Sequence, residues 1–383
     1  MLFWYDSKVR NIVFQLLFIG LLFFLVSTII TNTNQNLEQR GITTGFDFLN
    51  QEAGFGILQS LVEYDETHTF GKTFIVGLLN TILVATLGII TSTIVGFLVG
   101  VGRLSHNWLT SRLCGVYIEI FRNIPVLLQI LFWYIAVLQV LPSPRQSIAL
   151  GESLFLNIRG LYLPAPIFEH GSWLIFGALA YAIVKIIGIS IWAKNRQIKT
   201  GKTFPSFRVG LSLIILFPII AFFIAGQPIS LEMPVLKGFN FRGGITVIPE
   251  LMALLFGLTF YTASYIAENV RSGIEAVSKG QREAAGALGL SENKTMRLVI
   301  IPQAMRVVIP PLATNYMNLI KNSSLATAIG YPELVNVFMG TTLNQTGQAI
   351  EIIVMTMAVY LFININVSLF MNWFNNRMAL IER

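Results

Sequence analysis

Apolar residues occur in long runs along this chain, with short polar stretches between them. Most runs approach the roughly 20 residues that an α-helix needs to cross a lipid bilayer. Eight membrane segments are predicted from this pattern. They cover residues 12–30, 74–101, 114–140, 172–193, 209–225, 250–270, 304–325 and 347–371. The pattern therefore predicts an all-α protein that crosses the membrane about eight times.

Two of these segments contain residues that disturb a lipid-exposed helix. Segment 209–225 contains Pro218, and segment 304–325 contains two adjacent prolines and Lys321. Proline leaves a backbone carbonyl without its helical partner, and a charge inside the membrane needs a partner or water. We expect neighbouring helices to satisfy these groups.

The composition also indicates a membrane protein. The 383 residues are 54% hydrophobic and only 12% charged, which leaves too little polar surface for a soluble fold. The net charge of +7 does not indicate nucleic-acid binding, because the basic residues lie in short stretches between apolar runs. A single cysteine, Cys114, excludes an intramolecular disulfide and any CxxC site.

The first apolar run follows Lys8 and Arg10 and has the position of a secretory signal. It is longer than the apolar core of a signal peptide, and residues 31–34 supply no small-residue cleavage site. We interpret it as an uncleaved first helix.

The basic residues predict the orientation, since Lys and Arg near helix ends are retained in the cytoplasm. With the N-terminus inside, the inner loops and ends carry 17 Lys and Arg, and the outer loops carry six. Both termini are therefore predicted to be cytoplasmic.

The outer loops are predicted to be irregular. Loop 31–73 is acidic, and we favour a solvated connector over a ligand site there. Loops 141–171 and 226–249 are rich in proline and glycine, which favours irregular segments at the outer surface.

The stretch 278–302 predicts two short helices joined by a turn. Ser278 and Gln281 have the spacing of a capping box, and Gly289 suits a left-handed helix end. Ser291 is expected to cap the second helix, and Pro302 is expected to end it.

The first of these helices has an almost bare surface of small residues, at positions 284–287. Such a surface lets another protein approach closely, so the helix is a candidate for insertion into a partner's groove. From the residues alone, an ordinary helix at the membrane surface explains the pattern equally well.

A family resemblance separates these alternatives. Glu283, Ala284 and Ala285 are followed after three residues by Gly289, and nine residues later comes the run that ends at Pro302. This pattern resembles the EAA loop of ABC-importer permeases, with conservative differences only in the final run. The resemblance implies that 278–302 is a coupling helix region that docks on a separate cytosolic ATPase.

Three further stretches resemble the branch of this family that imports polar amino acids such as histidine, glutamine, glutamate and arginine. They are 121–125 with Gln129, 258–268 and 319–326. The branch commonly has Gly-Thr where this chain has Asn123 and Ile124. Long general L-amino-acid permeases have similar extra helices.

The resemblance implies a five-helix type I permease core with three added helices. The chain is then divided into four parts. These are an N-terminal helix and external loop (1–73), the first part of the core (74–140), inserted external loops with a two-helix hairpin (141–249), and the second part of the core (250–383), whose coupling loop is 271–303.

Charged residues in the membrane segments suggest two ion pairs. Glu119 with Arg122, and Glu268 with Arg271, are each three residues apart and can pair on one helix face. We favour a structural or gating pair over contact with substrate for both. Lys185 is expected to extend towards the inner membrane surface.

Two polar groups are candidates for a substrate pathway. The residues of the first group, on segment 250–270, are Tyr261, Thr262, Ser264 and Tyr265. Those of the second, on segment 304–325, are Lys321, Asn322, Ser323 and Ser324. Helix packing explains the first group about as well, and extension of Lys321 to the membrane surface is the alternative for the second.

No catalytic residue and no metal site is predicted. Two Gly-Lys-Thr triplets lack the first glycine of a P-loop, and the three histidines, His68, His106 and His170, lie in predicted loops. By resemblance, ATP and Mg²⁺ are used by a partner ATPase and no cofactor is bound by this chain.

The resemblance therefore implies the permease subunit of an ATP-driven importer of polar L-amino acids in a bacterial inner membrane. The expected partners are a cytosolic ATPase dimer, a second permease subunit that is more often a related chain than a copy, an extracytoplasmic amino-acid-binding protein and membrane lipid. No nucleic-acid partner is expected. The rival interpretations are an ion-gradient-driven amino-acid transporter and a membrane-embedded enzyme.

Overall fold

The computed structural model describes residues 7–39 and 45–378 of the chain. The outermost parts of the predicted cytoplasmic ends, 1–6 and 379–383, lie outside the described residues. Within the described part, seven helices are long and apolar enough to cross a membrane, or eight if one bent pair is counted as a span. The predicted fold class of a helical, multi-span membrane protein is confirmed.

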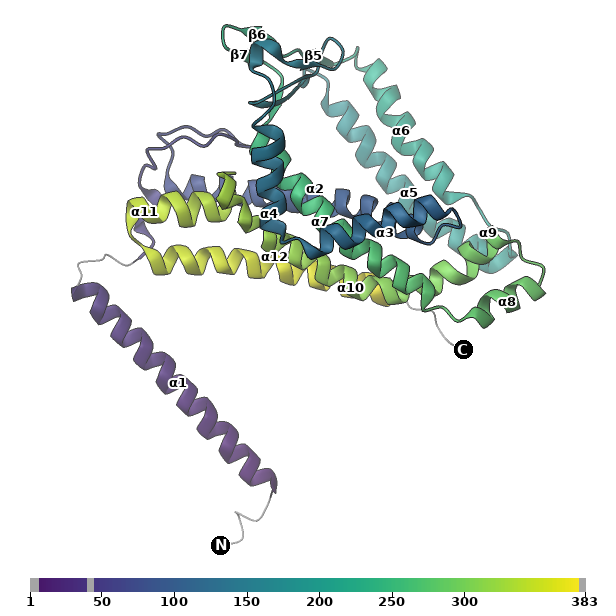
Figure 1. Cartoon of the computed structure of the whole chain (residues 1–383), viewed down its shortest axis with the longest axis horizontal. Coiled ribbons are helices and arrows are strands. Elements are labelled where there is room, and N and C mark those ends of the chain that lie inside the picture. The colour runs from purple at the N-terminus through teal and green to yellow at the C-terminus, as the bar shows by residue number, and fades with distance from the viewer. Residues whose placement is uncertain (1–6, 40–44, 379–383) are drawn as a thin grey trace. The chain divides into compact units, whose positions relative to one another are not determined.

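Six of these helices are single continuous elements, which are labelled in Figure 1. They are α1 (Ser7–Gln39), α2 (Phe70–Arg103), α5 (Trp173–Thr200), α6 (Ser206–Ile224), α7 (Pro249–Glu275) and α12 (Ala349–Met378). The seventh spans residues 292–329 and is built from α9 (Glu292–Thr295), a π-helical segment Met296–Ile300, α10 (Ile301–Asn322) and a 3₁₀ segment Ser323–Ile329.

The bent pair lies at the membrane segment predicted at 114–140. It consists of α3 (Trp108–Asn123) and α4 (Val126–Leu131), which continues as a π-helical segment Phe132–Leu138. The two parts meet at an angle of 106°. The predicted segment is therefore present as a bent pair of helices, which begins at Trp108.

Pro125 explains the break. The residue before a proline avoids the helical conformation, and Ile124 has an extended backbone with φ −99° and ψ 129°. The side chain of Gln129 folds back and donates to the carbonyl oxygens of Phe121 and Ile124, each at 2.9 Å. These bonds satisfy carbonyls that the break leaves without helical partners.

The helix predicted to end at Pro302 instead continues into the membrane. Pro302 lies in the first turn of α10, where its missing N–H does little harm. The turn before it is widened, and the N–H of Ile301 donates to the carbonyl of Met296 five residues earlier. The widened turn lets the chain pass the proline without stopping, so this prediction was wrong.

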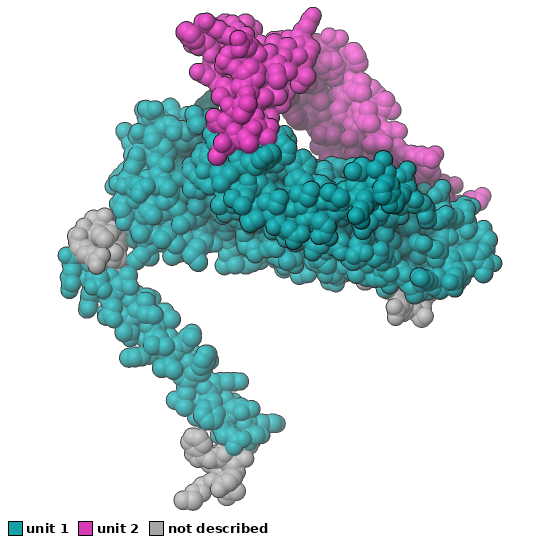
Figure 2. Space-filling model, viewed as in Figure 1, with its two compact units in different colours: residues 1–134, 253–383 teal, residues 135–252 magenta. Residues whose placement is uncertain are grey.

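The described chain forms two compact units, coloured separately in Figure 2. Unit 1 takes the described parts of Met1–Tyr134 and Ala253–Arg383. In it, α2 packs closely on α7 and α10 through small residues. A methyl group on Gly100 would lie 2.8 Å from the carbonyl oxygen of Ala267, and one on Gly88 would lie 3.1 Å from Leu319. Glycine permits this close approach of helix backbones in membranes.

Part of the acidic outer loop packs against the membrane helices of unit 1. The acidic side chains between residues 45 and 69 are exposed, as a solvated connector requires. Phe48, from the short 3₁₀ helix Asp47–Asn50, is however only 1% exposed and packs with Phe70, Leu334 and Phe338. The segment is therefore anchored to the membrane helices by an apolar cluster.

Beyond the seventh span, unit 1 continues through a π-helical segment Val335–Thr342 and a short helix α11 (Leu343–Thr346) before α12 begins. The coupling-loop helix α8 (Lys279–Ala287) lies between α7 and α9 in sequence.

Unit 2 covers Ile135–Met252 and contains a helical hairpin. Its helices α5 and α6 pack along each other, with Tyr181 stacked on Phe217 at 5.6 Å between ring centroids. The ammonium of Lys185 lies 5.2 Å from the centroid of the Tyr181 ring.

The two outer loops of unit 2 contain strands, so the prediction of irregular segments was wrong. The first loop forms a 3₁₀ turn Pro144–Gln146 and strands β1 (Ile148–Ala149), β2 (Phe155–Asn157), β3 (Gly160–Leu163) and β4 (Ala165–Phe168). The second forms β5 (Ile229–Glu232), β6 (Val235–Lys237), β7 (Asn240–Arg242) and β8 (Ile245–Val247).

The strands pair as an antiparallel sheet in the order β1-β2-β3-β8 and as two hairpin-like pairs, β4-β5 and β6-β7. Phe241 stacks on Phe155 at 4.6 Å and on Tyr162 at 4.8 Å between centroids. The glycines that favoured irregular loops instead form the turns. Gly160, with φ +124°, completes the turn between β2 and β3, and Gly238, with φ +68°, the turn between β6 and β7.

Candidate functional site

A polar cavity of about 270 Å³ lies between α7 and α10 in unit 1. Its lining residues are Tyr261, Thr262, Tyr265, Asn315, Asn318 and Asn322. The two tyrosines are four residues apart on α7, and the three asparagines are spaced by three and four residues on α10. Residues at these spacings share one helix face, so the helical repeat alone brings the polar groups together.

The cavity offers uncharged hydrogen-bonding groups. The hydroxyls of Tyr261 and Tyr265 lie 3.2 Å apart, and the Tyr265 hydroxyl donates to the carbonyl oxygen of Arg122 at 3.5 Å. The Nδ2 of Asn315 is buried and bonds to no other described group. A buried amide nitrogen without a partner costs about 1–3 kcal/mol, so this group favours a polar molecule in the cavity.

Four of the eight predicted pathway residues line this cavity: Tyr261, Thr262, Tyr265 and Asn322. The others have different positions. Ser264 and Ser323 are buried and donate to the carbonyl oxygens of Tyr261 and Ile320, three residues earlier in each helix. These two hydroxyls therefore serve the helix backbone.

Ser324 and Lys321 also lie outside the cavity lining. Ser324 donates to the carbonyl oxygen of Lys321 at 2.7 Å, and the Lys321 side chain is exposed. Lys321 is therefore not part of the cavity lining, and its contact with a substrate carboxylate stays a prediction.

The sequence analysis missed Asn315 and Asn318. A signal for them was present, because Asn315, Asn318 and Asn322 repeat at helical spacing along one predicted membrane segment. The prediction was placed at the end of that helix because of the positive charge of Lys321. The amide series one turn earlier is the better marker of the cavity.

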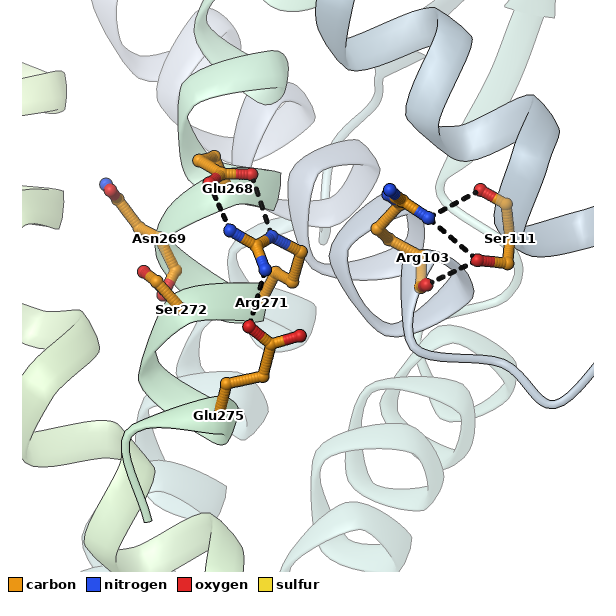
Figure 3. Close-up of polar contacts among 7 residues, drawn as sticks. All are labelled: Arg103, Ser111, Glu268, Asn269, Arg271, Ser272 and Glu275. Carbon is orange, nitrogen blue, oxygen red and sulfur yellow. Dashed lines mark hydrogen bonds and ion pairs between the residues drawn. The ribbon is translucent and has the colours of Figure 1, made fainter. Parts of the chain in front are cut away.

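Of the two predicted ion pairs, the pair on α7 is formed. The guanidinium of Arg271 donates to both carboxylate oxygens of Glu268, at 2.6 and 3.0 Å, and also to Glu275 (Figure 3). All three side chains come from the last turns of α7, three or four residues apart.

The predicted pair of Glu119 with Arg122 is not formed. Glu119 instead accepts from the Asn123 side chain at 3.3 Å, while the Arg122 guanidinium lies 5.4 Å from the centroid of the Tyr265 ring. An exposed ion pair gains little energy, so a contact with an aromatic face competes with it effectively. The prediction of this pair was wrong.

The coupling-loop helix α8 ends in a complete Schellman motif. Gly289 is left-handed, with φ +74°. Its N–H donates to the carbonyl of Gly286, and the N–H of Leu290 donates to that of Ala285. The predicted left-handed end at Gly289 is therefore present in the structure.

The predicted capping box at the start of α8 is absent. The Ser278 side chain makes no cap hydrogen bond, and only its carbonyl accepts from the N–H of Gln281. Gln281 instead accepts from the side chain of Gln303 at 3.3 Å. Ser291 likewise precedes α9 without a side-chain cap bond.

The surface of α8 is bare and mostly exposed. Ala284, Gly286 and Ala287 are exposed, Leu288 is 81% exposed, and only Ala285 is buried. Glu283 is also exposed, and a methyl group on Gly286 would meet nothing within 4 Å. This surface is open to contact by another protein.

A buried carboxyl group lies just beyond the seventh span, at Glu333. It accepts from the N–H groups of Val335 and Asn336, from Thr327 and from the hydroxyl of Tyr360 on α12. Burial raises the pKa of Glu333 from 4.5 to about 7, against these hydrogen bonds, which lower it. Sequence analysis missed this residue, since a lone glutamate in a short loop has no distinguishing pattern.

The family model of the binding-protein-dependent transport system inner membrane component matches residues 195–380. The chain is 52% identical over 379 residues to the general L-amino acid transport system permease protein AapQ of Rhizobium johnstonii, covering 99% of this chain and 94% of that protein.

A second relative is the glutamate/glutamine/aspartate/asparagine transport system permease protein BztB of Rhodobacter capsulatus. It is 39% identical over 411 residues, covering 99% of this chain and 96% of that protein. Among solved structures, a chain from the crystal structure of an amino acid ABC transporter with histidines aligns with a TM-score of 0.47 and 18% identity. That alignment covers 80% of this chain and 95% of the other.

Proposed function

The chain belongs to the permeases of amino-acid ABC transporters, and on this premise we propose that it carries polar L-amino acids through the cavity between α7 and α10. The observation that carries the proposal is the lining of that cavity. It consists of three side-chain amides and three hydroxyls, with no ionised side chain.

Such a lining suits a zwitterion of variable side chain. Amides and hydroxyls offer both donors and acceptors, so they can bond an ammonium, a carboxylate or a side-chain amide without preference for one net charge. The names of AapQ and BztB refer to general L-amino acids and to glutamate, glutamine, aspartate and asparagine. We propose the same substrate class here.

A separate ATPase is proposed to dock on α8. Support comes from the exposed small residues, from Glu283 beside them and from the Schellman turn that holds the end of the helix. Ala284 and Ala285 belong to the motif that resembles the EAA loop, and Pro302 follows at the start of α10. ATP and Mg²⁺ are proposed to act in that partner, and no cofactor is assigned to this chain.

The complete transporter is proposed to contain a second permease subunit, preferably a related chain, and to receive its substrate from an extracytoplasmic binding protein. Both termini are proposed to face the cytoplasm. In this arrangement the ATPases close on ATP and shift the permease between its two access states.

The proposal is tested by uptake of radiolabelled glutamine and glutamate into proteoliposomes that contain the chain with its candidate partners. Uptake is expected to require ATP, and Asn318→Ala is expected to reduce it while the complex still assembles. A matched control is Asn195→Ala, an exposed asparagine on α5.

The same assay distinguishes the proposed function from the rival interpretation, an ion-gradient-driven amino-acid transporter. An ion-gradient transporter moves amino acids without ATP and loses activity when an ionophore abolishes the gradient. Uptake by the isolated chain under a gradient, with no dependence on an ATPase, would refute the proposed function.

A further inference from the structure

A second hollow in unit 1, the arginine groove, lies among the C-terminal end of α2, one face of α3 and the last turns of α7. Its volume is about 540 Å³. Its charged lining residues are Arg103, Arg112, Glu119, Arg122, Glu268 and Arg271. Four guanidinium groups therefore meet only two carboxylates in the lining.

The sequence of α3 builds one wall of this groove. Arg112, Gly115, Glu119 and Arg122 are spaced by three, four and three residues, so they form one helix face. Gly115 has a structural part in it, because a methyl group there would lie 3.2 Å from the guanidinium of Arg103. The missing side chain leaves room for that arginine.

The carboxylates neutralise only part of the groove. Arg271 is held by Glu268 and by Glu275, as Figure 3 shows. In the same figure Arg103 bonds to the hydroxyl of Ser111, at 2.9 Å, and to no carboxylate.

The remaining two arginines add to the positive charge. The Arg122 guanidinium lies over the Tyr265 ring, and Arg112 is exposed on the face of α3. Among the described residues, neither lies within ion-pair distance of a carboxylate. The groove therefore has a surplus of guanidinium groups directed at one space.

The groove and the amide-lined cavity meet at one residue pair. Tyr265 lines the cavity, and its ring and hydroxyl both contact Arg122 of the groove. Tyr261, Tyr265 and Glu268 follow at helical spacing on α7, so a polar surface continues from the cavity to the groove. Glu268 and Arg271 lie near the end of α7 that leads to the coupling loop.

Guanidinium groups match carboxylates in geometry as well as charge, because their planar fork donates two parallel hydrogen bonds. Arginines at membrane depth are costly unless water or a partner meets them. We propose that the arginine groove binds the carboxylates of the amino acid after it leaves the cavity, on the coupling-loop side. The proposal rests on the proposed function and adds a second, charge-selective position to it.

An acidic amino acid carries one more carboxylate than glutamine, and arginine carries an additional cation. The groove therefore discriminates by net charge, which the uncharged cavity does not. The first test measures initial uptake of glutamate, glutamine and arginine by the reconstituted complex, for the wild type and for Arg112→Gln and Arg122→Gln.

Each variant is expected to slow glutamate uptake about tenfold, the effect of losing one charge-assisted hydrogen bond, and to slow glutamine uptake less. Arginine uptake is expected to be unchanged or faster. Arg122→Lys is expected to restore part of the glutamate rate, since it restores the charge without the fork. The matched control is Arg196→Gln on α5, where the guanidinium lies over Trp192 outside the groove.

A second test does not depend on transport. Binding of radiolabelled glutarate, a dicarboxylate without an ammonium group, is measured on the purified complex in detergent. The wild type is expected to bind glutarate. The double variant Arg112→Gln, Arg122→Gln is expected to lose this binding, and Asn318→Ala is expected to keep it.

Three outcomes overturn the proposal: equal losses for all three amino acids, no change in any of them, or absent glutarate binding. A fourth outcome also overturns the proposal. If a higher fraction of anionic phospholipid restores the uptake activity of the variants, the groove binds lipid phosphate. A wild type that moves no amino acid refutes the proposed function itself. If the variants lose uptake of all three amino acids equally while the wild type still takes up glutamine, only the proposed role of the arginine groove is refuted.

Discussion

Gly96 of α2 lies so close to Ile266 of α7 that a methyl group on the glycine would be 2.6 Å from the Cβ of the isoleucine. The same methyl group would be 3.0 Å from the carbonyl oxygen of Ala263. Because one of these atoms is backbone, the contact cannot be relieved by a side-chain rotation. The contact between Gly96 and Ile266 therefore sets the distance between α2 and α7. Helix α7 supplies three of the six residues that line the amide-lined cavity.

Gly96→Ala is expected to lower the free energy of unfolding by about 1–3 kcal/mol, the usual cost of an overpacked core. Thermal unfolding of the purified complex in detergent measures it. The control is Gly188→Ala on α5, where a methyl group meets nothing within 4 Å. Equal melting temperatures for Gly96→Ala and the wild type would contradict the close packing.

Gln129→Leu is expected to destabilise the bent pair of α3 and α4. The substitution keeps a side chain of similar size but removes the donor to the carbonyls of Phe121 and Ile124. Two partly buried carbonyls left without partners cost up to about 1–3 kcal/mol each. Gln197→Leu, at an exposed position of α5, is the control for the same change. Identical unfolding curves for the two variants would show that the amide does not hold the break.

Arg271→Gln is expected to destabilise the complex by about 1–3 kcal/mol, because it leaves Glu268 without its charged partner. The double variant with Glu268→Gln is expected to recover part of this loss, with an interaction energy of at least about 0.5 kcal/mol. Chemical unfolding of the four proteins completes the cycle. Strict additivity of the two single changes would mean that the ion pair contributes nothing.

Gly289→Ala is expected to weaken the association of the ATPase with the chain. The left-handed backbone at φ +74° costs alanine about 1 kcal/mol, which disturbs the end of α8. Co-purification of the ATPase and ATP-dependent uptake are the measurements. Gly201→Ala has the same kind of strain at the end of α5, with φ +69°, and is expected to retain the ATPase. Loss in both variants would point to a general folding defect.

The pKa of Glu333 predicts a pH dependence of stability. The folded pKa of about 7 lies above the unfolded value of 4.5, so the folded state keeps a proton that the unfolded state releases. This contribution is present below pH 4.5 and is lost as the pH rises to 7, a total of about 3 kcal/mol.

Glu333→Gln is expected to remove this change of stability with pH, which is the wild-type slope, since the amide does not titrate. Melting temperatures of both proteins from pH 4.5 to 8 provide the measurement. Glu63→Gln, at an exposed residue of the outer loop, is expected to keep the wild-type slope. A variant of Glu333 with the full wild-type slope would assign the pH dependence to another group.

The membrane character and the placement of the helices could be predicted from the sequence, because both follow from local properties. A run of about 20 apolar residues is a membrane helix whatever its neighbours are. The left-handed end at Gly289 is equally local, since it depends only on the backbone freedom of one residue.

The outer loops show where the local signal misleads. Proline and glycine around Gly160 and Gly238 were interpreted as irregular structure, although they form the turns between short strands. Strand pairing joins β3 to β8 across more than 80 residues of sequence, and no local pattern reports such a partner.

For the site, the sequence by itself determined which polar residues share a helix face, since Tyr261 with Tyr265 and Asn315 with Asn322 follow the helical repeat. Only the tertiary structure decided that these two faces meet, that Arg122 lies on Tyr265 instead of pairing with Glu119, and that Glu333 is buried. The reason is that spacing within a helix is a property of the chain, whereas the contact between helices depends on close packing at residues such as Gly96.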